Sequence, residues 1–288
     1  GDHRDLHYPL RRQRQMCIRD RNCSIYILKK TKHVVETNNL SISWGELNVL
    51  NKINFKLYEG EKLAIVGPSG SGKSTILKIL AGLILPTAGE LSIFGQKQTY
   101  LRLDQTNPPD VRLVFQNPAL LGSLTIEENV GFILQKNKNL SKKFIQEIVS
   151  ECLEEVGLFN IEKKLPNELS GGMQKRVSFA RALITDQDLD KKSQPLLLFD
   201  EPTAGLDPIA SSRIEDLINN TNNKANGSSI VVSHVLSTIE RTSEKVVMLY
   251  GGKFRWAGSI DEFKESNDPY VFQFRNGNLA GPMQPKDI

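Results

Sequence analysis

Apolar and polar residues alternate in two successive stretches near the start of the folded part of the chain. Val34–Trp44 and Val49–Leu57 both follow the period of two that a half-buried strand requires, so they predict an antiparallel pair. Shorter and mostly apolar runs follow, with the length and composition of strands that are buried on both faces. We expect these strands at Lys62–Val66, Val111–Phe115, Leu196–Asp200, Ser229–Ser233 and Lys245–Tyr250.

Stretches with the three-and-four spacing of helices lie between the apolar strands. They predict helices at Ser74–Ala81, Ile126–Leu134, Lys142–Val156, Gly172–Leu183 and Ala210–Asn219. Apolar strands that alternate with helices indicate an α/β fold, with a mostly parallel sheet covered on both faces. No apolar run reaches the roughly 18–20 residues of a membrane-spanning helix.

The net charge of +4 is unevenly distributed along the chain. The first 32 residues contain nine Lys or Arg and three Asp, so the remainder is close to neutral. A nucleic-acid-binding body would need a basic face of its own, and we therefore expect no nucleic-acid partner. The three cysteines (Cys17, Cys23 and Cys152) have no CxxC spacing, which argues against a disulfide framework or a zinc site and favours a reducing compartment.

The two ends of the chain differ from the part between them. Residues 1–33 are basic and their first twenty residues lack periodicity, and we expect a disordered or non-native extension; a lipid-contacting arm and a targeting segment are the alternatives. Residues 266–288 are rich in Gly, Pro and Asn, which predicts a C-terminal tail that either reaches a neighbouring subunit or is disordered. We place one domain between them, at residues 34–265.

The segment GPSGSGKST fits the phosphate-binding pattern G-x-x-x-x-G-K-[ST] and lies between a predicted strand and a predicted helix. Its glycines allow backbone N–H groups to point at phosphate oxygens, and the helix dipole adds positive potential. We call it the phosphate loop and expect all its residues to bind nucleotide. They are Gly67, Pro68, Ser69, Gly70, Ser71, Gly72, Lys73, Ser74 and Thr75.

Two carboxylates follow another apolar strand, in LLLFDEP. Asp200 ends that strand at the edge of the sheet where ligands of open α/β folds bind, and it suits a contact to Mg²⁺. Glu201 is next along the chain and can orient or deprotonate a water molecule near a γ-phosphate. Together with the phosphate loop, the pair predicts hydrolysis of ATP.

Further motifs occur in a fixed order along the chain: Gln116 in VFQN, LSGGM at Leu169–Met173, AGLDP at Ala204–Pro208, and His234 in VVSH. With the phosphate loop and LFDEP, they make residues 36–262 resemble the ATP-binding cassette (ABC) ATPases. This resemblance implies a RecA-like core with an antiparallel β-subdomain and an inserted helical subdomain at about residues 118–185. The polar stretch Asp186–Gln194 is longer than is usual there, and we expect a surface loop insertion.

The resemblance also implies roles for individual residues. Lys73, Ser74 and Thr75 would bind phosphate and Mg²⁺, with Asp200 supporting the metal and Gln116 sensing the metal and the attacking water. Glu201 would be the catalytic glutamate, and His234 would contact the γ-phosphate. Trp44 falls where the family places an aromatic side chain that stacks on adenine; a core or edge-strand tryptophan is the alternative.

The signature segment Leu169–Met173 would act across a dimer. In the family, Ser170, Gly171 and Gly172 close over the ATP that a second copy binds, and Asp207 lies in a loop that crosses the seam. This implies a head-to-tail dimer with two buried ATP molecules. Met173 stands where most relatives have a glutamine, which makes a polar contact near the opposing nucleotide. Methionine is a weak hydrogen-bonding group, so that contact is lost or replaced by packing.

The resemblance narrows further to the ATPases of phospholipid-trafficking systems, through LSGGMQKR and NPALLGSLTIEENVGF. It implies an ATPase subunit on the cytoplasmic face of a membrane, bound to a separate permease and in some systems to a lipid-shuttling protein. Candidate permease contacts are Leu120, Leu121 and Leu124, whose alternative is ordinary packing. The competing functions are an importer of small polar solutes and a soluble ABC ATPase scaffold, as in iron–sulfur assembly.

Overall fold

The structure is a computed structural model that describes residues 32–136, 140–184, 194–225 and 227–284. Most of the predicted basic segment therefore lies outside the described residues, together with Cys17 and Cys23. The same holds for the predicted loop insertion Asp186–Gln194, of which only Gln194 is described.

The larger sheet contains the strands that lead into the predicted motifs. Its order is β10-β9-β3-β8-β7-β6, and every neighbouring pair is parallel except β10 with β9. The mostly parallel sheet predicted from the sequence is confirmed. The strands are β3 (Lys62–Val66), β6 (Val111–Val114), β7 (Leu196–Asp200), β8 (Ser228–Val232), β9 (Lys245–Tyr250) and β10 (Lys253–Ser259).

The smaller sheet is antiparallel and has the order β2-β1-β4-β5. It confirms the expected antiparallel pair, β1 with β2, and adds two strands from the segment after the phosphate-loop helix. The four strands are β1 (His33–Trp44), β2 (Leu47–Tyr58), β4 (Ala88–Ile93) and β5 (Gln96–Lys97).

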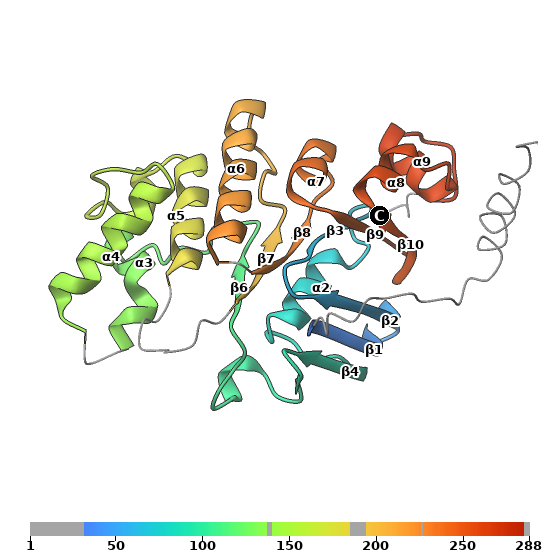
Figure 1. Cartoon of the computed structure of the whole chain (residues 1–288), viewed down its shortest axis with the longest axis horizontal. Coiled ribbons are helices and arrows are strands. Elements are labelled where there is room, and N and C mark those ends of the chain that lie inside the picture. The colour runs from blue at the N-terminus through green and yellow to red at the C-terminus, as the bar shows by residue number, and fades with distance from the viewer. Residues whose placement is uncertain (1–31, 137–139, 185–193, 226, 285–288) are drawn as a thin grey trace, which may run out of the picture. The chain divides into compact units, whose positions relative to one another are not determined.

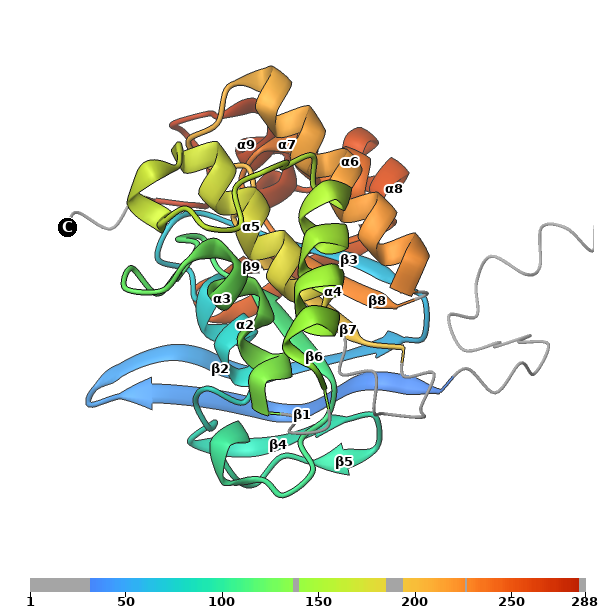
Figure 2. The same cartoon turned by 90° about the vertical axis from the view of Figure 1, so that its left-hand side faces the viewer.

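Helices cover both faces of the larger sheet. In Figure 1, α6 and α7 lie on one side of it, and α2 lies on the other side with the smaller sheet. Figure 2 shows α4 beside α5, and both pack with α3 into a helical group. The helices are α2 (Lys73–Leu80), α3 (Ile126–Val130), α4 (Lys142–Glu155), α5 (Gly171–Leu183), α6 (Pro208–Ala225), α7 (Leu236–Thr242), α8 (Ile260–Glu265) and α9 (Pro269–Asn276), with 3₁₀ turns at Arg102–Asp104, Gly131–Lys136 and Pro166–Glu168.

Alternate residues of the central strands enter different apolar clusters, because successive side chains of a strand point to opposite faces. Leu63 and Ile65 of β3 face α2 and the smaller sheet, whereas Ala64 and Val66 face α7, α8 and α9. Leu197 and Phe199 of β7 pack against the helical group, where Phe199 stacks on Phe179 of α5. The sheet is thus fixed from both faces, which holds the carboxyl ends of its strands in place.

The segment after Ser266 differs from the disordered alternative, because its described part is folded. Asp268 caps α9 by accepting from the amides of Tyr270 and Val271, and Gly277 ends the helix in the left-handed conformation. Val271 and Met283 are buried in the cluster that also contains Phe263. Among the described residues, no helix is both long and apolar enough to cross a membrane.

Candidate active site

The phosphate loop connects β3 to α2, and two of its glycines lie where there is no room for a side chain. At Gly67 (φ +149°) a Cβ would lie 2.2 Å from the carbonyl oxygen of Leu249. At Gly72 (φ +101°) it would lie 2.9 Å from Leu50 Cδ2, in the backbone region that favours glycine. The close approach of β9 and β2 therefore fixes the path of the loop.

Lys73 is buried at the start of α2 and turns back over the loop. Its Nζ donates to the carbonyl oxygens of Gly67 (2.8 Å) and Pro68 (3.0 Å). Burial lowers the pKa of Lys73, whereas the nearby charges of Glu201 and Asp200 act in the opposite direction. Ser71 Oγ is also buried, and it has no hydrogen-bond partner among the described residues. A buried ammonium beside an unpartnered hydroxyl fits the oxygens of a bound phosphate.

Ser74 joins the phosphate loop to β7, because its Oγ donates to Asp200 Oδ1 at 2.9 Å. Burial raises the pKa of the Asp200 carboxyl, and the bond from Ser74 opposes that shift in part. A hydroxyl and a carboxylate at this distance are hard oxygen ligands of the kind that Mg²⁺ prefers. The sequence prediction that these two residues share a site is consistent with this geometry.

Glu201 lies at the next position and has an uncommon backbone conformation, with φ +46°. Its amide donates to the carbonyl oxygen of Val232 in β8 (2.9 Å), which holds the turn. Its carboxylate lies 2.9 Å from His234 Nδ1 and accepts from the His234 amide at 3.4 Å. The side chain of Glu201 is 10% exposed and that of His234 is 58% exposed, so the pair opens to solvent on the His234 side.

Replacement of Asp200 by asparagine is expected to raise the melting temperature at pH 7. Because burial holds the folded-state pKa above the ordinary value of 3.8, the unfolded chain releases the proton first as pH rises, and the charged form costs the native state stability. Asparagine removes this charge and keeps an acceptor for Ser74. Thermal unfolding without nucleotide or Mg²⁺ checks this: the advantage of Asp200→Asn should shrink as pH falls toward 3.8. A lower melting temperature at pH 7 would contradict it.

The signature segment begins α5 and leaves its glycines open. Ser170 caps the helix by accepting from the Met173 amide at 3.3 Å. Among the described residues, a Cβ at Gly171 would meet nothing within 4 Å, and one at Gly172 would meet only Leu206, at 3.9 Å. Packing against these residues therefore does not require glycine at either position. Met173 is half-buried and packs on the apolar cluster of the helical group.

Lys175, which the sequence analysis did not select, links α5 to the residues after Glu201. Its Nζ donates to the carbonyl oxygen of Ala204 and, at 3.4 Å, to that of Pro202. Burial lowers its pKa, and the charge of Glu201 acts in the opposite direction. The sequence does not indicate this contact, because Lys175 and the residues after Glu201 lie far apart in the sequence.

The other predicted site residues lie apart from this group. Asp207 caps α6 by accepting from the amides of Ile209 and Ala210, both at 3.0 Å, and these bonds lower its pKa. Trp44 is exposed at the end of β1, and Gln116 is exposed after β6. Neither side chain makes a hydrogen bond within the part of the chain that the structure describes. The structure thus brings together Lys73, Ser74, Asp200, Glu201 and His234, and leaves Trp44, Gln116, Asp207 and the signature segment outside their bonded contacts.

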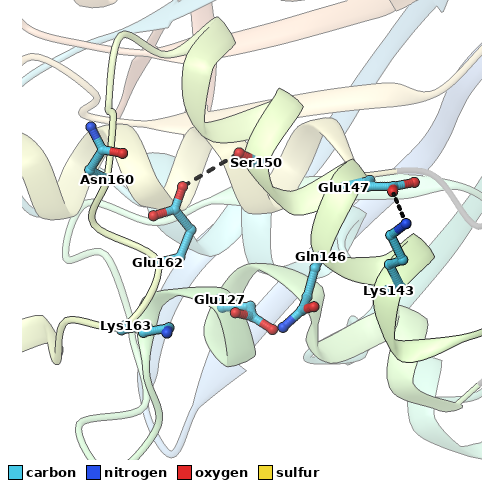
Figure 3. Close-up of a pocket in the computed structure, with 8 residues that line it drawn as sticks. All are labelled: Glu127, Lys143, Gln146, Glu147, Ser150, Asn160, Glu162 and Lys163. Atoms are coloured by element: carbon cyan, nitrogen blue, oxygen red, sulfur yellow. Dashed lines mark hydrogen bonds and ion pairs between the residues drawn. The ribbon is translucent and has the colours of Figure 1, made fainter.

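A polar pocket lies elsewhere, on the helical group between α3, α4 and the segment after α4 (Figure 3). Two contacts join residues that line the pocket. Ser150 donates to Glu162 at 3.4 Å, and Lys143 pairs with Glu147 along α4 at 3.9 Å. None of the predicted nucleotide-site residues lines it. It lends no support to the chemistry proposed for the phosphate loop.

Comparison with known proteins identifies the family. The model of the ABC transporter family matches residues 50–204. The chain is 45% identical to protein TRIGALACTOSYLDIACYLGLYCEROL 3, chloroplastic, of Arabidopsis thaliana, over 87% of this chain and 76% of that protein. It is 34% identical to the intermembrane phospholipid transport system ATP-binding protein MlaF of Haemophilus influenzae, over 88% of this chain and 95% of that protein.

A solved structure agrees with these relatives. The dimeric, post-hydrolysis ATP-binding cassette MJ0796 bound to ADP and Pi superimposes with a TM-score of 0.68 at 30% identity, covering 78% of this chain and 98% of that chain. The predicted RecA-like core, antiparallel β-subdomain and helical subdomain have the architecture of this family. The chain therefore belongs to the ABC transporter family, as an ATP-binding subunit that hydrolyses ATP to drive transport.

Proposed function

We propose that this subunit powers the movement of a phospholipid or related glycerolipid by a separate membrane permease. The assignment of the ATPase site is supported by one group of residues at the carboxyl ends of adjacent strands. They are Lys73, Ser74, Asp200, Glu201 and His234. The lipid assignment is supported by two relatives: one belongs by name to an intermembrane phospholipid transport system, and the other bears the name of a glycerolipid.

In the proposed site, Lys73 leaves the carbonyl oxygens of Gly67 and Pro68 and binds the β- and γ-phosphates. The unpartnered Ser71 hydroxyl and the loop amides supply further donors. Ser74 and Asp200 would hold Mg²⁺, with Gln116 as a third ligand from outside their contacts. When bound, the metal would neutralise charge on the phosphate oxygens.

Glu201 is the proposed base that orients and deprotonates the attacking water. Its carboxylate is bonded to His234 without nucleotide, and His234 is exposed enough to turn toward a γ-phosphate. Their present contact holds Glu201 in place until substrate arrives. Trp44, exposed beside the strand β2 that touches the phosphate loop, is the proposed platform for adenine.

A second copy of this chain is the proposed partner at the seam. No described residue crowds the Cβ positions of Gly171 and Gly172, which leaves room for a second nucleotide to approach the α5 amides closely. Asp207 would lie across the same seam, and one related cassette, MJ0796, has been solved as a dimer. The permease would hold the dimer at the cytoplasmic face of the membrane, and exposed Leu121 is a candidate contact.

Copurification from native membranes is expected to recover a multi-span permease, a lipid-shuttling protein and bound glycerolipid. Tagged Glu201→Gln protein, held closed by ATP, is extracted in mild detergent, and mass spectrometry identifies proteins and lipids. Wild-type protein with ADP serves as the control for contacts that do not depend on the closed dimer. A permease with a soluble solute-binding protein would replace the lipid assignment by solute import. Only soluble partners, from a preparation that retains other membrane complexes, would leave the scaffold function.

A further inference from the structure

A buried carboxylate anchors a polar network behind the proposed catalytic pair. Glu215 of α6 is 1% exposed. Its Oε1 accepts from Thr238 Oγ1 at 2.8 Å and from Ser237 Oγ at 3.3 Å, and its Oε2 accepts from Arg241 Nη1 at 2.9 Å. All three donors belong to α7. A carboxylate is costly to bury, and these charge-assisted bonds offset that cost.

The network continues from α7 into the loop that follows Glu201. Thr238 Oγ1 lies 2.8 Å from Thr203 Oγ1, and both threonines are fully buried. An ionised carboxylate only accepts hydrogen bonds, so the single hydroxyl hydrogen of Thr238 goes to Glu215. Thr203 must then donate to Thr238. The charge of Glu215 therefore fixes the donor of both hydrogen bonds: Thr203 donates to Thr238, and Thr238 donates to the carboxylate. We call these two bonds the threonine relay.

Both threonines are close in sequence to the residues that face the phosphate loop. Thr203 lies two positions after Glu201, whose φ of +46° must be held by its surroundings. Thr238 lies one helical turn after His234. The carbonyl oxygens on either side of Thr203, those of Pro202 and Ala204, are held by Lys175 of α5. The backbone after Glu201 is thus held by two sets of contacts: the hydrogen bonds from Lys175 and the threonine relay.

We propose that Glu215 is a positioning residue for ATP hydrolysis, which acts through Thr238 and Thr203 to keep Glu201 and His234 at bonding distance. This inference rests on the proposed roles of Glu201 and His234. Without the threonine relay, the loop after Glu201 would lose its hydrogen bond to α7, while the nucleotide-binding residues would stay in place. Turnover would fall, and affinity for ATP would not.

The test removes one hydroxyl at a time and keeps the shape of the side chain. Thr203→Val and Thr238→Val should each lower kcat of the full chain about tenfold, because small misplacements of catalytic groups have effects of this size. The KM for ATP should change less than about twofold, since substrate-binding contacts remain. The double variant should lose no more than Thr238→Val alone, because that single substitution already breaks the bond that Thr203→Val breaks. Thr238→Ser keeps the hydroxyl and should restore kcat.

Thr221→Val is the matched control. Thr221 is on α6, as Glu215 is, and its buried hydroxyl has no hydrogen-bond partner among the described residues. It should leave kcat unchanged, and melting temperatures of all variants show whether folding is affected. Unchanged kcat in Thr238→Val, equal loss in Thr221→Val, or no rescue by serine would each overturn the inference. If Glu201→Gln turns over ATP normally, the proposed site itself fails; if it is inactive and Thr238→Val is not impaired, only the positioning role fails.

Discussion

Replacement of Glu201 by glutamine is expected to lower ATP turnover by at least about a hundredfold, the size of effect typical for loss of a general base. The amide cannot take a proton from water, yet it has the same shape and can still bond to His234. Nucleotide binding should persist, because Lys73 and the phosphate loop are unchanged. Steady-state phosphate release and equilibrium binding of ATP separate the two effects.

Glu240→Gln is the matched control for that variant. Glu240 is an exposed residue of α7, and its carboxylate makes no hydrogen bond or ion pair within the described ranges. The same chemical change there should leave turnover near the wild-type value. Substantial turnover by Glu201→Gln would remove Glu201 from its proposed role, and equal losses in both variants would show that the effect is not local.

Two variants that each fail to dimerise are expected to form an ATP-bound dimer when they are mixed. Lys73→Ala removes the phosphate contact, and Gly171→Asp places a charge where a second nucleotide would approach. In a head-to-tail dimer, one site of the mixed pair would combine the intact phosphate loop of one chain with the intact signature segment of the other. Both substitutions are made in the Glu201→Gln background, so that hydrolysis does not reopen the dimer.

Size-exclusion chromatography with ATP measures this result, and the mixed dimer should contain about one ATP rather than two, because only one of its two sites is intact. A Cβ at Gly171 would meet nothing within 4 Å in the part of the chain that the structure describes, so the aspartate variant should fold normally. Gly122→Asp tests for a general effect of the added charge, since that position also has room for a Cβ among the described residues and has no left-handed backbone. A dimer from Gly171→Asp alone, or none from the mixture, would contradict the proposed seam.

The positions of the apolar strands were largely predictable from the sequence, whereas their order in the sheet was not predicted. Lys62–Val66, Leu196–Asp200 and Lys245–Tyr250 were predicted with the bounds that the structure shows. Strand β4 was missed because its first three positions are exposed, which leaves little alternation, whereas β10 was missed although Lys253–Trp256 alternates polar and apolar residues. The helix α9 was missed although Asp268-Pro269 and Gly277 are its start and stop signals, because the composition around it is typical of a tail.

Five of the residues predicted for the candidate site lie together in the structure, but the contacts between them could not be predicted from the sequence. The order of parallel strands brings Asp200 and Glu201 near the end of β8, but no local pattern indicates that His234 Nδ1 bonds to Glu201. The buried contacts of Glu215 and Thr203 had even less signal in the sequence, since a glutamate on a helix is usually solvated. Its burial follows from packing of α6 against α7, which only the three-dimensional structure provides.

The position of β3 in the larger sheet has a consequence for synthesis of the chain. This strand leads into the phosphate loop, yet its neighbours are β8 and β9, which leave the ribosome more than 160 residues later. At ordinary elongation rates, the apolar stretch Lys62–Val66 waits about ten to thirty seconds for its partners. The nascent chain must keep this strand from pairing with others during that time. From this strand order we expect fragments that end before β8 to aggregate, because the apolar strand β3 has neither of its partners.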